Sequence, residues 1–285
     1  ALEHLAAMAK GTAVPLTAAT TTGLAEQYAE FGWKTDDAVL RAMASVEKQP
    51  DVSAVRNAIR SAYTPWLENC AKAFQAAVGS GDPATSYPAT ALPQWPAGTC
   101  VVFCDGFRLD LAHRLEGALN TRGLSTTLTT RLTALPSITS SAKPAVSPIA
   151  SLLGGGPGLD PSVLSTGGAL SIGVLRGQLE GAGWQVLFDS DTGDPSGRAW
   201  TEAKNIDNIG HNETTHLPSL AGSTMVELAD RLASLLEAGW KQVVVVTDHG
   251  WLYLPGGLPK AEVEVSLAEQ NLKKGRCARL KPGAH

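Results

Sequence analysis

Two short apolar runs, each followed by an aspartate, constrain the fold of this chain most. The first covers residues 99–104 (TCVVFC) and precedes Asp105, and the second covers residues 242–247 (QVVVVT) and precedes Asp248. Continuous apolar runs of this length are typical of strands that are buried on both faces. The sequence therefore predicts a sheet that lies between two layers of helices.

Further segments alternate between strand-like and helical patterns. We predict additional strands at residues 125–133 and 183–188, and helices at residues 109–119, 170–182 and 223–238. Alternation of this kind is typical of a mainly parallel sheet covered on both faces. The predicted fold class is therefore α/β, with a mainly parallel sheet flanked by helices.

The region before the first strand has a different pattern. Apolar residues at helical spacing predict helices at 24–31, 36–46 and 52–78, whereas residues 79–98 contain four prolines and little periodicity. We expect a helical N-terminal region over residues 1–80, a connector over 81–98 and an α/β core over 99–285. Residues 134–169, rich in Pro, Gly and Ser, predict a long loop, which compact domains keep mostly for function.

Charge and composition exclude two classes of protein. The chain has 23 Lys and Arg against 27 Asp and Glu, and its sequence has no dense basic block. It therefore lacks the clustered positive charge that is typical of a stable nucleic-acid binder. A nucleic acid remains possible as a transient substrate. No run approaches the roughly 18 apolar residues that span a bilayer. Four cysteines without a CxxC pair indicate reduced thiols, and we expect a cytoplasmic protein with no membrane partner.

The residues that end the two apolar runs are candidate metal ligands. Ligands of open α/β sheets bind outside the carboxyl ends of the strands, where Asp105, Asp248 and His249 are expected. Carboxylates and imidazole bind metals, and Gly250 allows the sharp turn that lets Asp248 and His249 converge. The alternative for a single such aspartate is a cap of the following helix.

Two further segments carry candidate site residues. Asp207 and His211, in KNIDNIGH, have a spacing that suits a divalent cation, although a surface loop can show the same spacing. Thr139 lies in LPSITSS, where the alternative is a turn with local hydroxyl bonds.

Taken together and in this order, the four segments resemble the alkaline phosphatase superfamily, particularly its phosphodiesterase and phosphoglycerate mutase branches. The stretches VVFCDGFRLDLAHRL, LPSITSSAKPAVSP, KNIDNIGH and VVVVTDHGWLYLPGGLPK resemble more closely the PglZ domain of bacterial BREX phage-defence systems. This resemblance covers roughly residues 55–285. It implies an alkaline-phosphatase-like core in a cytoplasmic defence system against bacteriophages, with other defence proteins as partners.

The resemblance also implies roles for single residues. One divalent ion would be held by Asp105, Asp248, His249 and the Thr139 hydroxyl, and a second by Asp207 and His211. Coordination lowers the pKa of a hydroxyl, so Thr139 is the expected nucleophile that attacks phosphorus. One or two ions are expected, with zinc favoured and manganese or magnesium as alternatives.

The second ion usually has one more histidine in this superfamily. His285 is the only histidine after His249, and His216 is the other candidate in this chain. Otherwise we expect the missing ligand to lie beyond this chain, so that the core is truncated at its C-terminus.

Several side chains are secondary candidates. Arg108 is expected to clamp a phosphate oxygen, because a guanidinium fits phosphate geometry, and Lys143 is a weaker candidate for the same role. Ser137 and Ser140 compete with Thr139 as nucleophile. Trp251 either stacks on a base or packs under its loop.

The leading functional hypothesis is a metal-dependent phosphoester hydrolase that acts on diesters, with nucleic acids or nucleotides as candidate substrates. The alternative is a non-catalytic or regulatory assembly module of the defence complex that retains a phosphatase-like fold.

Overall fold

The computed structural model describes residues 1–81, 87, 92–155, 160–203, 206–207, 217–257, 267–268, 277 and 280–281. Its N-terminal region is helical, as the spacing of apolar residues predicts. The elements are α1 (Leu2–Thr12), α2 (Thr21–Gln27), the π-helix η1 (Tyr28–Gly32), α3 (Trp33–Ala44) and α4 (Gln49–Gly79).

A four-stranded parallel sheet forms the centre of the molecule. Its strands are β1 (Thr99–Phe103), β4 (Gln185–Leu187), β5 (Arg198–Glu202) and β6 (Gln242–Val246), in the order β4-β5-β1-β6. Phe103 of β1 is in register with Glu202 of β5 and with Val246 of β6, so these three strands end at one edge. The predicted α/β class with a parallel sheet is confirmed.

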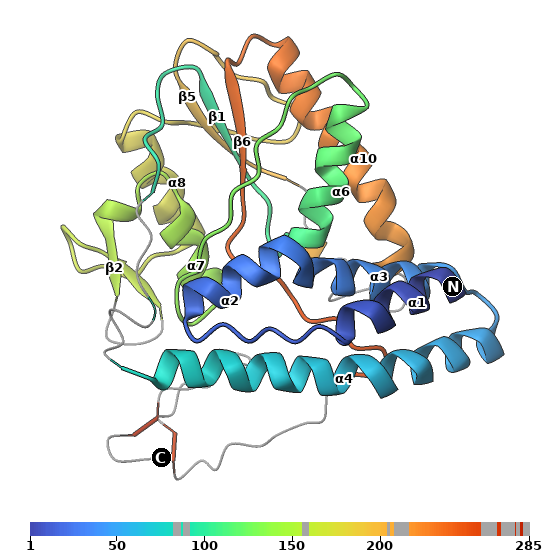
Figure 1. Cartoon of the computed structure of the whole chain (residues 1–285). Helices are drawn as coiled ribbons and strands as arrows, with labels where there is room; N and C mark the ends of the chain where they lie inside the picture. The colour runs from blue at the N-terminus through green and yellow to red at the C-terminus, as the bar shows by residue number, and fades with distance from the viewer. Residues whose placement is uncertain are drawn as a thin grey trace.

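Helices cover both faces of this sheet (Figure 1). They are α6 (Leu109–Asn120) and α10 (Leu217–Glu237) on one face, and α7 (Thr139–Val146) and α8 (Ile172–Gly181) on the other. Strand β1 supplies both cores, because successive residues of a strand point to opposite faces. Cys100 and Val102 join the cluster that contains Leu111 of α6, whereas Val101 joins the cluster that contains Leu179 of α8.

The N-terminal helices lie at the carboxyl edge of the sheet. Figure 1 shows β1 and β6 running toward α2, α3 and α4, and the chain that leaves β6 passing along these helices. Ile59 and Trp66 of α4 are buried in the same apolar cluster as Val102 of β1 and Leu111 of α6. The helical layer and the sheet therefore share one core.

One predicted strand is absent from the structure, and one observed strand was not predicted. Residues 125–133 form no strand in the structure. Ser and Thr occupy most of the segment and Leu128 is 37% exposed, so it lacks the buried face on which the strand preference of β-branched residues depends. Strand β5 was not predicted, because only Ala199 and Trp200 in its centre are apolar and polar residues flank them.

Residues 134–169 contain more structure than the predicted long loop. They form α7, the 3₁₀ turn η2 (Ala150–Leu152) and a hairpin of β2 (Leu153–Gly155) with β3 (Pro161–Val163). Ala142 and Val146, four residues apart, give α7 a buried face that its Ser and Pro content obscured. No helix within the described ranges is long and apolar enough to cross a bilayer.

Candidate metal centre

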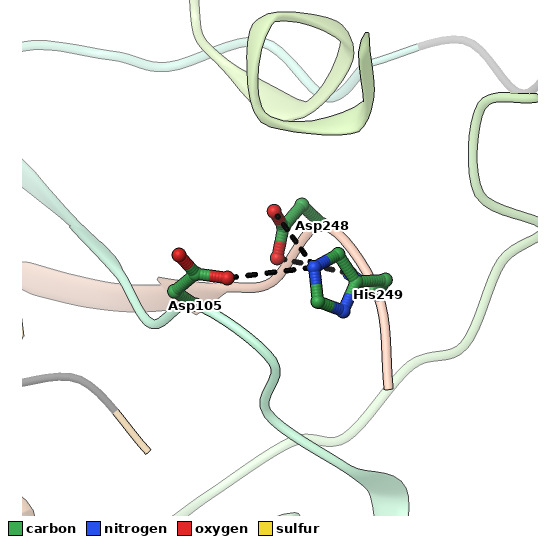
Figure 2. Close-up of side chains that lie close together, drawn as sticks. All are labelled: Asp105, Asp248 and His249. Carbon is green, nitrogen blue, oxygen red and sulfur yellow. Dashed lines mark hydrogen bonds and ion pairs between the residues drawn. The ribbon is translucent and has the colours of Figure 1, made fainter. Parts of the chain in front are cut away.

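The candidate metal ligands lie on two loops at the carboxyl edge of the sheet. Asp105 follows β1, and Asp248 and His249 follow β6, the parallel neighbour of β1. Figure 2 shows these three side chains pointing toward one another. Thr139 is the first residue of α7. Strand pairing therefore brings together residues that are far apart in the sequence.

The polar atoms of this group are close enough to share one cation. One ligand atom from each of Asp105, Asp248 and His249 lies within 4.8 Å of the other two. His249 Nε2 is 3.5 Å from Asp105 Oδ1 and 3.6 Å from Asp248 Oδ2. The Thr139 hydroxyl oxygen is 3.1 Å from His249 Nε2 and 3.4 Å from Asp105 Oδ1.

The His249 ring is held with one nitrogen available to a metal. Its Nδ1 lies 3.0 Å from the Gly250 carbonyl oxygen. A carbonyl only accepts, so Nδ1 carries the hydrogen and the lone pair of Nε2 faces the carboxylates. Metal-binding histidines are oriented in this way by a backbone carbonyl or a carboxylate.

Asp248 has one satisfied and one unsatisfied carboxylate oxygen. Oδ1 accepts hydrogen bonds from the backbone amides of Gly106, at 3.3 Å, and His249, at 3.0 Å. Oδ2 is buried, and among the described residues none donates a hydrogen bond to it. An unsatisfied buried oxygen is costly, and a cation at this point would satisfy it.

Negative charge accumulates around Asp105. Burial, followed by the charges of Asp248 and Asp207, raises its pKa from 3.8 to about 6. Burial also raises the pKa of Asp248. A divalent cation would offset this repulsion, and two carboxylates with one imidazole suit Zn²⁺, Mn²⁺ or Mg²⁺. The residues therefore fit a divalent metal.

Asp207 lies beside the loop that carries Asp105. Its Cβ is 3.1 Å from the point that a Cβ at Gly106 would occupy, and Trp251 Cδ1 is 3.3 Å from that point. Asp207 is not one of the three residues grouped as ligands. His211, its predicted partner, lies outside the described residues, as do His216 and His285.

Gly106 is a position in this loop at which a side chain would be strained. Its φ of +63° is unfavourable for other residues, and a Cβ would press on Asp207 and Trp251. We expect Gly106→Ala to lower the free energy of unfolding by about 1–2 kcal/mol, measured by urea denaturation. Gly117→Ala in α6 is the control and should stabilise by about 0.5–1 kcal/mol, because nothing lies within 4 Å of its Cβ. Equal effects of the two substitutions would contradict this reading of Gly106.

Arg108 does not lie where a phosphate clamp requires it. Its Nε and Nη2 donate to the two carboxylate oxygens of Asp110, at 2.8 and 2.9 Å, and the residue is 5% exposed. The paired donors that would hold a phosphate are therefore occupied. Arg108 therefore takes no part in the proposed chemistry.

The other secondary candidates are also placed by the structure. Ser137 and Ser140 are exposed, whereas the Thr139 hydroxyl lies beside the candidate metal ligand His249. Lys143 is buried, and its Nζ lies 2.8 Å from Glu202, which ends the unpredicted strand β5. Trp251 packs against the loop that carries Asp105, where its Nε1 donates to the Gly106 carbonyl.

Comparisons of the chain with models of protein families, with curated proteins and with solved structures find no match.

Proposed function

We propose that this chain is a metal-dependent phosphoester hydrolase domain that prefers diesters. The observation that supports this most is the position of the Thr139 hydroxyl, 3.4 Å from Asp105 Oδ1 and 3.1 Å from His249 Nε2. The hydroxyl thus lies at a group that can hold a divalent cation. The motif resemblance to the PglZ domain and to the alkaline phosphatase superfamily supports the same assignment.

The residues of the centre have distinct roles in this proposal. Asp105, Asp248 and His249 would hold the ion, which when bound supplies positive charge that lowers the pKa of the Thr139 hydroxyl. Thr139 Oγ1 forms a bond to phosphorus as the bond to the leaving alcohol breaks, and the hydroxyl proton ends on that alcohol. Water then cleaves the Thr139 phosphoester, so that one diester and one water give one monoester and one alcohol.

The chain itself provides the orientation. The Gly250 carbonyl fixes the His249 ring, and the backbone amides of Gly106 and His249 fix the Asp248 carboxylate. Thr139 occupies the first turn of α7, where the partial positive charge of the helix end favours an approaching phosphate. These groups are in place before a substrate arrives, which limits the reorganisation required for the reaction.

The proposed setting is a cytoplasmic anti-phage defence system, in which the substrate is a nucleic acid or a nucleotide and other defence proteins are partners. The chain has a net charge of −4 and no dense basic block, so such a substrate would contact the centre rather than a broad basic surface.

One observation favours the alternative of a non-catalytic assembly module. Arg108 and Lys143, the two cations expected to bind phosphate, are paired with Asp110 and Glu202. Under this alternative the metal centre stabilises or regulates the fold without catalysing hydrolysis.

A hydrolysis assay distinguishes the hydrolase from the non-catalytic assembly module. The protein loaded with Mn²⁺ or Zn²⁺ is assayed on bis-p-nitrophenyl phosphate and on p-nitrophenyl phosphate, with metal content measured in the same sample. We expect faster hydrolysis of the diester, and in acid-quenched samples a mass increase on the peptide that contains Thr139. No hydrolysis above buffer by protein with bound metal would overturn the hydrolase proposal and favour the assembly module.

A further inference from the structure

A network of five polar side chains, three of them buried and two partly buried, lies between the N-terminal helices and the loop that carries Asp105. We call it the Asp36 network, and its members are Tyr28, Asp36, Tyr63, Arg108 and Asp110. The hydroxyls of Tyr28 and Tyr63 each donate to the Asp36 carboxylate at 2.5 Å. Arg108 is paired with Asp110 through two hydrogen bonds, and its Nη2 is 3.9 Å from Asp36 Oδ2.

The network joins four separate elements. Tyr28 belongs to η1, Asp36 to α3 and Tyr63 to α4, whereas Arg108 and Asp110 lie at the start of α6. Burial, and then the charge of Asp36, raises the pKa of both tyrosines, so their hydroxyls remain donors. Buried charges that are paired in this way add little net stability compared with apolar packing, but they do favour one geometry.

Arg108 connects this network to both metal-ligand loops. It follows Asp105 by three residues, and its guanidinium lies 4.3 Å from the centre of the Trp251 ring, two residues beyond His249. Trp251 Nε1 in turn donates to the Gly106 carbonyl at 2.7 Å. The two loops are therefore held against one another at a point that the network fixes.

Helix α4 contacts the chain that follows His249 at another point. Arg60 donates from Nη1 to the carbonyls of Pro255, at 3.0 Å, and Gly257, at 2.9 Å. Figure 1 shows this part of the chain passing along the N-terminal helices after it leaves β6. The helical layer thus contacts the continuation of the His249 loop as well as the start of α6.

We propose that the Asp36 network is a positioning device for the metal centre. Through Arg108 it holds the loops of Asp105 and His249 at the separation that a shared cation requires. The helical N-terminal region is then part of the centre, and Asp36 and Arg108 are positioning residues. This inference deepens the proposed function and rests on the same centre.

Metal affinity provides the first test. Asp36→Asn keeps the size of the side chain and removes its charge, and Asp37→Asn is the matched control, because Asp37 is the next residue of α3 and pairs with Arg41 and Arg114. We expect Asp36→Asn to raise the Mn²⁺ dissociation constant, measured by titration calorimetry, by about 10- to 100-fold. The control should change this dissociation constant by less than about threefold.

Hydrogen exchange in the metal-free protein provides the second test, which requires neither metal nor substrate. In Asp36→Asn, amides of residues 104–108 and 247–254 should exchange about tenfold faster, whereas those of β1 and β6 should not change. Tyr63→Phe, which removes one donor and keeps the ring, should show the same pattern more weakly, and it replaces Asp36→Asn if that variant does not fold.

The outcomes separate this inference from the hydrolase proposal. If the loop amides of Asp36→Asn and Tyr63→Phe exchange at the same rate as those of Asp37→Asn, the positioning role is overturned, whatever the activity of the wild type. If the wild type does not hydrolyse diesters but the loop amides of Asp36→Asn exchange faster, the hydrolase proposal is overturned and the positioning role is supported.

Discussion

Replacing Thr139 by alanine is expected to reduce diester hydrolysis by the metal-loaded protein about a thousandfold or more, because the proposed nucleophile is lost. Thr139 is the first residue of α7 and is only partly buried, so alanine should preserve the helix. Initial rates on bis-p-nitrophenyl phosphate at saturating Mn²⁺ measure the effect. Mn²⁺ affinity should fall much less, because Asp105, Asp248 and His249 remain.

The next residue provides a matched control for this prediction. Ser140 also carries a hydroxyl in the first turn of α7, but it is exposed, so Ser140→Ala should keep the wild-type rate within about twofold. Thr139→Ser should retain measurable activity because it keeps the hydroxyl. A Thr139→Ala rate within tenfold of wild type would show that this hydroxyl is not the nucleophile.

Asp105→Asn is expected to stabilise the metal-free protein at pH 7. The folded-state pKa of Asp105 is about 6, compared with an ordinary value of 3.8. In the pH range between these values the folded state holds a proton that the unfolded state has lost, so stability falls as pH rises from about 4 through about 6. Asparagine removes this penalty because it carries no charge.

The size of this effect follows from the shift in pKa. The shift corresponds to about 3 kcal/mol, and screening by solvent at a side chain that is 16% exposed reduces the expected gain to about 1–2 kcal/mol. Urea denaturation in EDTA should show the gain at pH 7, and the gain should decrease at pH 4. Saturating Mn²⁺ should reverse the order, because at 100 times its dissociation constant an ion adds about 2.7 kcal/mol to the wild type.

Two results would contradict this account of Asp105. One is a variant no more stable than wild type at pH 7 in EDTA. The other is a gain that persists unchanged in Mn²⁺, since the ion should stabilise the chain that retains this carboxylate more than the variant.

The convergence of Asp105 with Asp248 and His249 could be predicted from the sequence because it depends on one rule of sheet topology. Parallel strands end at the same edge, and both acids directly follow a continuous apolar run. The position of Glu202 at the same edge could not be predicted in this way, because the apolar pattern of β5 is too short to be recognised as a strand.

The role expected of Arg108 could not be judged from the sequence. Its distance from Asp105 along the chain indicates that it lies near the centre, but its guanidinium is bonded to Asp110 and also lies 3.9 Å from Asp36, which belongs to a different helix. Nothing in the spacing of Asp36 or Tyr63 connects them with the centre. Such long-range partners are set by how the helical layer packs on the sheet.

Calorimetric titration of Mn²⁺ and Zn²⁺ into wild type and Asp248→Asn tests the central claim most directly. Asparagine keeps the shape of Asp248 but removes the charge on the unsatisfied Oδ2. We predict saturable binding of at least one ion per wild-type chain. Loss of a group that only hydrogen-bonds a metal ligand typically lowers metal affinity roughly 10- to 100-fold, and we expect Asp248→Asn to lower it at least as much. Asp194→Asn, at an exposed loop residue, should bind like wild type. Absence of saturable binding to wild type, or equal affinity in Asp248→Asn, would contradict a metal centre formed by Asp105, Asp248 and His249.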